Sequence, residues 1–332
     1  MNPITLARAF KSGQVYGPLG PVRAVAALMT RRSLLVFTRQ TTLKLRIPGV
    51  VDGLDQSPLS VRIGLADRER AIGRSLAPHA YLDDCGLLLS SEGELLLVHE
   101  VRDAEPIVAT WRQPAERQAL ALVLAGEVGP TGFDQTMDAL ARHHGQAGEP
   151  RPERRWDPRA RDHWAAALGR LADAPTEVIT DAERRALADS TDAWLRAMDK
   201  VLVHRATERR VRDLHGELSL EHVFLVDPPV VIDPADVASA DERFADTAED
   251  VMRLAMELDL AGAPELAEAA VARYALSALD ARLADVAPFF KRLSAVRVAV
   301  DALAEPAPLD GEPDDRHERA RAALALALVY PM

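Results

Sequence analysis

Cysteine and lysine are both scarce in this 332-residue chain. Cys85 is the single cysteine, which excludes an intramolecular disulfide and any zinc or iron–sulfur site built from several thiolates. Lysine occurs only at Lys11, Lys44, Lys200 and Lys291, so arginine carries most of the positive charge. A lysine within a predicted strand, as Lys44 is, therefore calls for a specific explanation.

Long apolar runs and an excess of positive charge are also missing. No run approaches the roughly 18 apolar residues that span a bilayer, and the N-terminus has no continuous apolar segment of the signal-peptide kind. The net charge is −11, from 40 Lys+Arg against 51 Asp+Glu. A non-specific nucleic-acid binder needs a basic face instead. The sequence thus predicts a cytoplasmic protein without a membrane or nucleic-acid partner, and its 48% hydrophobic residues suffice for a large core.

The signature motifs of several enzyme classes do not occur. The chain has no G-x-x-x-x-G-K-[ST] phosphate loop, no G-x-G-x-x-G dinucleotide turn, no H-E-x-x-H zinc motif and no G-x-S-x-G hydrolase elbow. The adjacent pairs His143/His144 and His99/Glu100 do not form a metal motif, because neighbouring side chains on a helix or strand point in different directions. We interpret both pairs as ordinary core or surface positions.

The hydrophobic pattern predicts a β-rich front and a helical back. Residues 34–47 (LLVFTRQTTLKLRI) alternate in polarity and favour an antiparallel hairpin. A helix is expected over 65–77, which ends before Pro78. Further strands are expected at 86–90, 95–101, 223–226 and 230–232. Further helices are expected over 114–126, 133–144, 159–173, 181–203, 246–261, 264–284, 288–304 and 317–329.

Charge divides the chain in the same way. Residues 1–100 carry 12 Lys+Arg and 9 Asp+Glu, a balance of +3, and the remainder carries −14. We therefore predict an α+β, bilobal protein with a small antiparallel β-rich lobe at 1–110. A larger helical lobe follows at 111–332 and includes a loop and hairpin at 211–233.

The segment 211–233 (VRDLHGELSLEHVFLVDPPVVID) is the most informative stretch. Its pattern predicts a tight loop at His215 and Glu217, then a hairpin that delivers Asp233. Two acidic groups placed in this way suit metal-assisted phosphoryl transfer, in which one orients the attacking hydroxyl and the other holds Mg²⁺. The phosphate charge needs a cation in return. Lys44, fixed by Glu69 on the 65–77 helix, is the candidate.

These motifs together resemble the aminoglycoside phosphotransferase-like kinases, which have a protein-kinase-like fold. That family carries a catalytic loop of the form H-G-D-L-H-x-x-N, followed by a hairpin and a metal-binding Asp. The segments LLVFTRQTTLKLRIP, RERAIGRSLAPHAYL, RFADTAEDVMRLAMELD and FFKRLSAVRVAV resemble further parts of it, so that the likeness covers about residues 20–305. The loop positions correspond to His215, Gly216, Glu217, Leu218, Ser219 and His222, and the metal position corresponds to Asp233.

The resemblance implies ATP and Mg²⁺ as cofactors, and this chain departs from the pattern at several positions. Glu217 stands in place of the catalytic Asp, and a shift of about 1 Å in a catalytic group can cost on the order of 100-fold in rate. His222 stands in place of the second metal ligand, Asn, although Mg²⁺ prefers oxygen. The glycine-rich phosphate loop is replaced by residues 29–33, where Thr30, Ser33 or Arg32 would have to contact phosphate.

Two functions follow from these residues. The first is an ATP-dependent phosphotransferase that acts on a small-molecule hydroxyl, with Glu217 and His215 in the catalytic loop. Lys44 and Glu69 would then serve the nucleotide, and Asp233, with His222, the metal. The second is a degenerate kinase that keeps the bilobal fold as a nucleotide-binding or scaffolding protein without phosphoryl transfer. A separate, third possibility is that the apolar terminus 322–329 docks a partner. Each residue also has a plainer explanation: Lys44 as an exposed strand residue, Asp233 as a turn residue before a proline, and His215 as a residue that bonds the loop backbone.

Overall fold

A computed structural model describes residues 2–18, 20–51, 53–99, 102–150, 159–236, 244–305 and 314–332. The chain divides into two compact units, one of Met1–Arg117 with Val226–Ala240, and one of Gln118–Leu225 with Asp241–Met332. The first unit therefore includes the segment that carries Asp233, although this segment follows most of the second unit in sequence. Within the described residues, no helix is both long and apolar enough to cross a bilayer.

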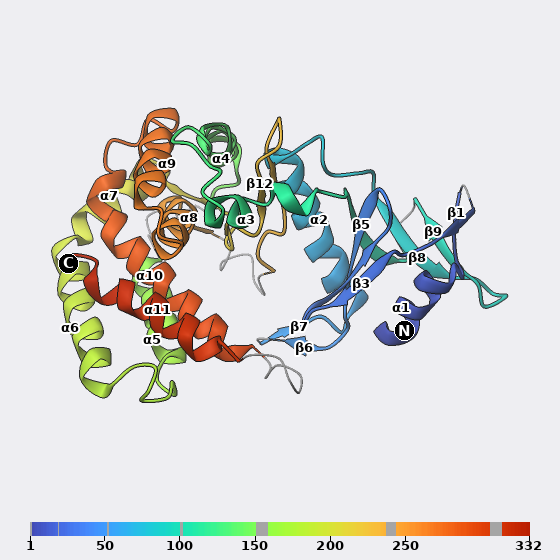
Figure 1. Ribbon diagram of the computed structural model, residues 1–332, viewed down its shortest axis with the longest axis horizontal. Helices are drawn as coiled ribbons and strands as arrows, with labels where there is room; N and C mark the ends of the chain where they lie inside the picture. The colour runs from blue at the N-terminus through green and yellow to red at the C-terminus, as the bar shows by residue number, and fades with distance from the viewer. Residues whose placement is uncertain are drawn as a thin grey trace. The chain divides into compact units, whose positions relative to one another are not determined.

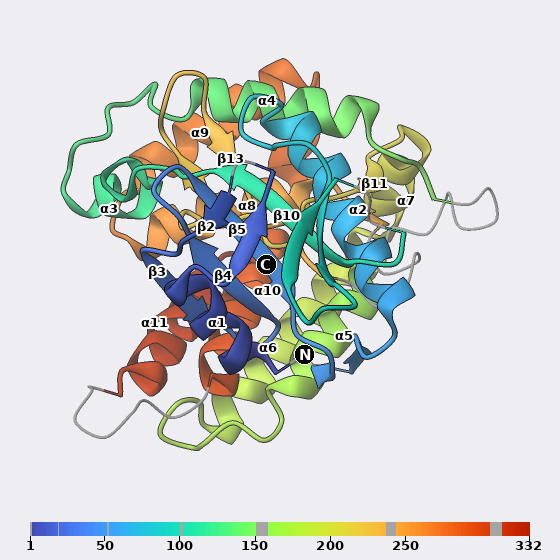
Figure 2. The same ribbon diagram turned by 90° about the vertical axis from the view of Figure 1, so that its right-hand side faces the viewer.

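The first unit is organised around a sheet, which has eight strands among the described residues (Figures 1 and 2). Its strand order is β2-β1-β9-β8-β10-β5-β4-β3, antiparallel except for the β1–β9 pair. The strands are β1 (Val15–Gly17), β2 (Gly20–Val22), β3 (Ala26–Met29), β4 (Ser33–Phe37), β5 (Thr41–Arg46), β8 (Cys85–Leu89), β9 (Leu95–Val98) and β10 (Glu105–Trp111). The predicted hairpin over 34–47 is thus confirmed as β4 and β5, joined at the expected turn. A small separate ribbon pairs β6 (Val50–Val51) with β7 (Leu54–Asp55).

Alternation along β5 places its side chains on two different faces. Leu43 and Leu45 belong to the hydrophobic core, together with Phe10 of helix α1 (Pro3–Ser12). The intervening Lys44 and the following Arg46 project to the opposite face, because successive strand residues alternate. This period-two pattern lets one strand build the core and present two cations.

Helix α2 (Leu59–Leu76) packs against β10 in the same unit. The sequence predicts its C-terminal two thirds, but the helix begins six residues earlier, directly after Pro58. Its buried residues include three charged side chains, Arg62, Glu69 and Arg70. A carboxylate is stable in such a position only with a cationic partner.

The second unit is mainly helical. Its helices are α3 (Ala119–Leu124), α4 (Asp134–Gln146), α5 (Ala160–Arg170), α6 (Asp181–Ala197), α7 (Asp199–Thr207), α8 (Ala248–Leu260), α9 (Pro264–Ser277), α10 (Leu283–Ala304) and α11 (Arg316–Val329). The helix predicted over 181–203 is divided into α6 and α7 at Met198, whose backbone leaves the helical conformation. Strand β11 (Val211–Asp213) pairs with β14 (Phe244–Asp246), and strand β12 (Val223–Phe224) forms at the first predicted hairpin position. Strand β13 (Val230–Val231), at the second position, belongs to the first unit.

The C-terminal helix packs within its own unit. Figure 1 shows α11 alongside α10, and Ala323, Leu324 and Ala327 are buried there. Val329 at its end remains exposed. Because the apolar face of this helix is already covered, it does not support the expectation that 322–329 docks a partner.

Candidate functional site

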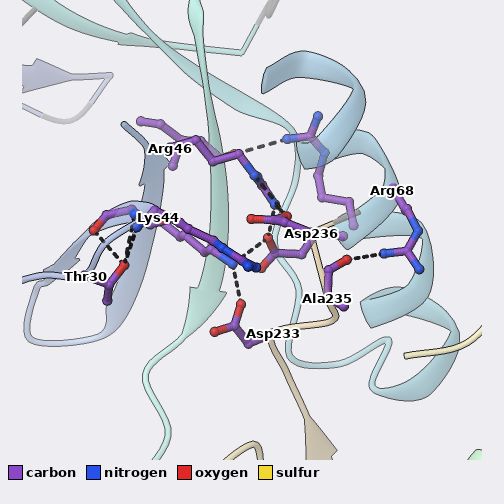
Figure 3. Close-up of polar contacts among 12 residues, drawn as sticks. Thr30, Lys44, Arg46, Arg68, Asp233, Ala235 and Asp236 are labelled. Carbon is purple, nitrogen blue, oxygen red and sulfur yellow. Dashed lines mark hydrogen bonds and ion pairs between the residues drawn. The ribbon is translucent and has the colours of Figure 1, made fainter. Parts of the chain in front are cut away.

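Three predicted site residues meet in the first unit. The Lys44 Nζ lies 3.0 Å from Glu69 Oε2 and also forms an ion pair with Asp233 (Figure 3). Lys44 comes from β5 and Glu69 from the middle of α2, and Asp233 follows β13. The structure therefore brings Lys44 of the sheet into contact with Asp233, although the two residues are 189 positions apart in sequence.

A second cation, Arg46, belongs to the same cluster. Its Nη2 lies 2.7 Å from Glu69 Oε2 and 2.6 Å from Asp236 Oδ1 (Figure 3). The Arg46 side chain is only 1% exposed. Arg46 and Asp236 were not predicted from the sequence. The available signal was the two-residue spacing from Lys44, which puts both cations on one face of β5.

The cluster combines two cations with three carboxylates in a buried setting. Burial alone would lower the pKa of Lys44, but the negative charges of Asp233 and Glu69 outweigh it and raise that pKa above its ordinary value. Lys44 is therefore fully charged at neutral pH. Its ammonium lies beside Asp233, whose side chain is 42% exposed.

Local backbone geometry fixes the segment that carries Asp233. Asp233 adopts a left-handed conformation with φ 62°, which Asp and Asn tolerate better than most residues. Arg68 of α2 donates through Nη1 to the carbonyl oxygen of Ala235 (Figure 3). With the Arg46–Asp236 ion pair, this contact ties residues 233–236 to both β5 and α2.

Tyr81 is a further buried residue near Glu69 and Asp233, and it was not predicted from the sequence. Burial raises the pKa of Tyr81 well above its ordinary value, and the charges of Glu69 and Asp233 raise it further. The ring lies directly on Gly73, where an added Cβ would come within 2.0 Å of the ring carbon Cζ. Glycine at this position of α2 is thus what allows Tyr81 to approach the acidic cluster.

The predicted phosphate-contact residues lie in the turn between β3 and β4. Thr30 Oγ1 accepts the backbone N–H of Ser33 at 2.9 Å and donates to the Ser33 carbonyl oxygen at 3.1 Å (Figure 3). The Ser33 side chain is buried, and its hydroxyl has no hydrogen-bond partner among the described residues. Thr30 therefore closes its own turn, and phosphate contact by Thr30 or Ser33 stays a prediction.

The predicted catalytic loop lies in the second unit and is anchored by Asp250. The backbone N–H groups of His215 and Gly216 donate to the Asp250 carboxylate at 2.9 and 2.8 Å. Gly216 has φ 86°, a conformation that favours glycine. His222 Nδ1 donates to the Glu217 carbonyl oxygen at 2.7 Å and so bonds the loop backbone as well.

Asp246 and Asp250 have separate roles. The helix predicted over 246–261 would put both on one face, but Asp246 belongs to β14 and only Asp250 lies in α8. Asp246 instead forms a fully buried ion pair with Arg205, at 2.7 Å. Only Asp250 contacts the loop, because the helix begins after Asp246.

Glu217 has a cation in its electrostatic surroundings. Burial lowers the pKa of Arg253 on α8, but Glu257, Asp301 and Glu217 outweigh it and raise that pKa. Glu257 accepts from Arg253 Nε at 2.7 Å and from the backbone N–H of Leu220 at 2.8 Å. The far end of the loop is therefore also tied to α8.

No three His, Cys, Asp or Glu side chains of the described ranges converge as a ready-made metal cluster.

Comparison with known sequences finds distant relatives. No family model matches the chain. Uncharacterized proteins of Mycobacterium bovis and Mycobacterium tuberculosis are 25% identical over 271 residues, which is 80% of this chain and 52% of each relative. The chain thus spans about half the length of the curated relatives it matches.

Solved structures define the class of fold. The choline kinase from Cryptosporidium parvum Iowa II aligns with a TM-score of 0.56 at 10% identity, over 91% of this chain and 87% of its own. The microcompartment-associated aminopropanol kinase gives 0.55 at 16% identity, over 91% and 90%. Amicoumacin kinase hAmiN, solved with AMP-PNP, Ca²⁺ and Ami, gives 0.50 at 13% identity, over 98% and 93%. The chain therefore has the α+β, bilobal, protein-kinase-like fold of small-molecule kinases, as the sequence resemblance implied.

Proposed function

We propose that this protein is an ATP-dependent phosphotransferase that acts on a small-molecule hydroxyl. The observation that carries the proposal is the ion-paired cluster of Lys44, Glu69 and Asp233 within a kinase-like fold. In such kinases, a lysine held by a glutamate serves the phosphates, and an aspartate holds the metal. ATP supplies the transferable phosphoryl group, with Mg²⁺ to neutralise its charge.

The residues present fit a magnesium–nucleotide complex in part. Asp233 offers carboxylate oxygens, the donors that Mg²⁺ prefers, and it is the more exposed partner of the Lys44 pair. His222 fits Mg²⁺ less well, because imidazole nitrogen is a poor ligand for it. Asp233 would therefore hold the metal and Lys44 the phosphates, with Glu69 fixing Lys44.

Glu217 is the candidate for the residue that orients or deprotonates the acceptor hydroxyl. A carboxylate of either length accepts a proton from an alcohol if it lies within hydrogen-bond reach. His215 is fully buried, and its backbone N–H is bound by Asp250. This geometry supports a structural role for His215 in holding the loop. The acceptor class is a small alcohol, by analogy with the choline, aminopropanol and amicoumacin kinases of similar fold.

The test is transfer of phosphate from ATP to a panel of amino alcohols and other small alcohols, with and without Mg²⁺. Lys44→Met and Asp233→Asn should abolish turnover and the thermal shift induced by Mg²⁺–ATP. Lys200→Met and Asp227→Asn change the same residue types at exposed positions and should leave both unchanged. Absence of both turnover and a nucleotide-induced shift in the parent protein would refute the proposal.

A degenerate kinase is the second candidate, because Glu217 and His222 both depart from the family pattern. The double variant Glu217→Asp with His222→Asn distinguishes the two. Activity that exists only in this variant, with nucleotide binding already present in the parent, would establish the degenerate kinase. The cytoplasmic location stays a prediction.

A further inference from the structure

The buried carboxylate of Asp250 is used by three donors at once. Its Oδ2 accepts the backbone N–H of His215 at 2.9 Å and His144 Nε2 at 3.1 Å, and its Oδ1 accepts the N–H of Gly216 at 2.8 Å. Burial would raise the pKa of Asp250, but these hydrogen bonds and the neighbouring histidines outweigh it and lower the pKa. Asp250 is therefore an ionised acceptor at neutral pH.

An ionised Asp250 determines where the proton of His144 lies. A carboxylate only accepts, so the Nε2 that faces it carries hydrogen. The other ring nitrogen, Nδ1, lies 2.7 Å from the Tyr274 hydroxyl. In the neutral imidazole Nδ1 is then an acceptor, and the Tyr274 O–H donates to it.

Tyr274 is suited to this donor role. It is 1% exposed, and burial raises its pKa well above the ordinary value, so the phenol keeps its proton. Its ring meets the His144 ring edge-on, with the centroids 5.7 Å apart. With a neutral His144, the hydrogen bonds run in one direction, from Tyr274 on α9 through His144 on α4 to Asp250 on α8, where the loop amides also donate.

The arrangement makes the loop depend on residues distant from it in sequence. Tyr274 and His144 are separated by 130 residues, and His144 and Asp250 by 106. Without the His144 donor, Asp250 would be a fully buried anion with two backbone donors. An anion in that state gains by moving toward other donors or water. Such a movement would shift the backbone that carries Glu217.

We infer that Tyr274 and His144 are positioning residues, which hold the His215–Glu217 loop in place through Asp250. The hydrogen-bonded geometry stands by itself, and the consequence for catalysis rests on the proposed phosphotransferase function. Neither residue is expected to touch the nucleotide or the acceptor.

The first test measures amide hydrogen exchange at His215 and Gly216 in the protein without nucleotide. Tyr274→Phe removes one hydroxyl at constant ring volume, and it should accelerate exchange at these amides by about 3- to 10-fold. His144→Ala should accelerate it more, and His144→Gln should restore part of the protection because its side-chain amide can donate to Asp250. The matched control is Tyr330→Phe, which removes a hydroxyl that donates to Asp259 at 2.6 Å. It should leave exchange at the loop amides unchanged.

The second test uses turnover. Tyr274→Phe and His144→Ala should lower kcat with little change in the KM for ATP, and His144→Gln should recover part of the kcat. The inference is overturned if loop exchange is unchanged in both Tyr274→Phe and His144→Ala. It is equally overturned if exchange rises by the same factor at amides of the core helix α10, since that reports general destabilisation. If the parent shows no turnover, the proposed function fails, but the exchange result still decides the positioning role.

Discussion

The guanidinium of Arg46 lies closer to Glu69 than the ammonium of Lys44 does, at 2.7 Å against 3.0 Å, and both contact the same oxygen, Oε2. Arg46 also holds Asp236, whereas Lys44 also pairs with Asp233. Glu69 thus keeps a cation even when Lys44 moves to another partner. The two cations therefore differ in role: Arg46 holds both buried carboxylates, and Lys44 is the cation to which the proposed function assigns the nucleotide.

This difference in role predicts unequal costs for removing the two cations. Arg46→Met leaves two buried carboxylates short of a partner and should destabilise the fold by about 3–5 kcal/mol. Lys44→Met should cost less, about 1–2 kcal/mol, because Glu69 keeps Arg46 and the half-exposed Asp233 can be hydrated. Urea denaturation of both variants measures the difference, with Lys200→Met as the control. Equal destabilisation by Arg46→Met and Lys44→Met would contradict this difference in role.

The contact between Gly73 and Tyr81 predicts a position-specific effect of alanine in α2. Gly73→Ala puts a methyl group into the Tyr81 ring and should destabilise the protein by about 1–3 kcal/mol. Gly64→Ala on the same helix meets nothing within 4 Å and should stabilise it by up to about 1 kcal/mol. Thermal unfolding of the pair checks this. The close packing would be disproved if both substitutions shifted Tm upward.

The backbone conformation at Gly216, in the predicted catalytic loop, indicates that this position does not tolerate a side chain. Its φ of 86° is unfavourable for alanine, so Gly216→Ala should cost about 1–2 kcal/mol. It should also loosen the two amides bound by Asp250, which hydrogen exchange would detect. Gly145→Ala, in helix α4 with open space around its Cβ, serves as the control and should not loosen them.

A buried carboxylate beside the loop anchor predicts acid sensitivity. Burial would raise the pKa of Glu249, but His163 and Arg297, each 2.6 Å away, outweigh it and lower the pKa from 4.5 to about 2. The folded-state pKa lies below the unfolded one, so ionised Glu249 contributes stability above about pH 4.5. That contribution is lost as the pH falls toward 2. It corresponds to about 3 kcal/mol.

The measurement is urea denaturation between pH 7 and pH 2 for the parent and for Glu249→Gln. The variant should be less stable at pH 7 and should lose less stability on acidification. Parallel pH profiles for the two proteins would show that Glu249 does not carry this dependence.

Much of the fold was predictable because its signals are local. Alternation identified the hairpin of β4 and β5, and the strands expected at 86–90 and 95–101 correspond to β8 and β9. Helix α1 was missed although Asn2 caps it, Pro3 begins it and Gly13 follows its end, which are ordinary helix-boundary signals. Helix α1 was therefore predictable from its local sequence.

The site was predictable only in part, because some of its contacts are purely tertiary. Lys44, Glu69 and Asp233 were found through their order in the chain and the family resemblance. The spacing of Arg46 from Lys44 puts both cations on one face of β5, but the partner Asp236 lies far along the chain. Tyr81 is recognisable only once it packs on Gly73. The link from Tyr274 to Asp250 joins three helices, and no spacing rule connects residues 130 positions apart.

The hydroxyl of Thr30 occupies backbone donors that an anion would otherwise use, since it accepts the N–H groups of both Arg32 and Ser33. A phosphate group that bound at this turn would have to replace the Thr30 hydroxyl as the acceptor of these N–H groups. The number of hydrogen bonds at the turn would then not increase. Under the proposed function, the turn would therefore contribute little to the free energy of phosphate binding. Most of that free energy would have to come from the ammonium of Lys44.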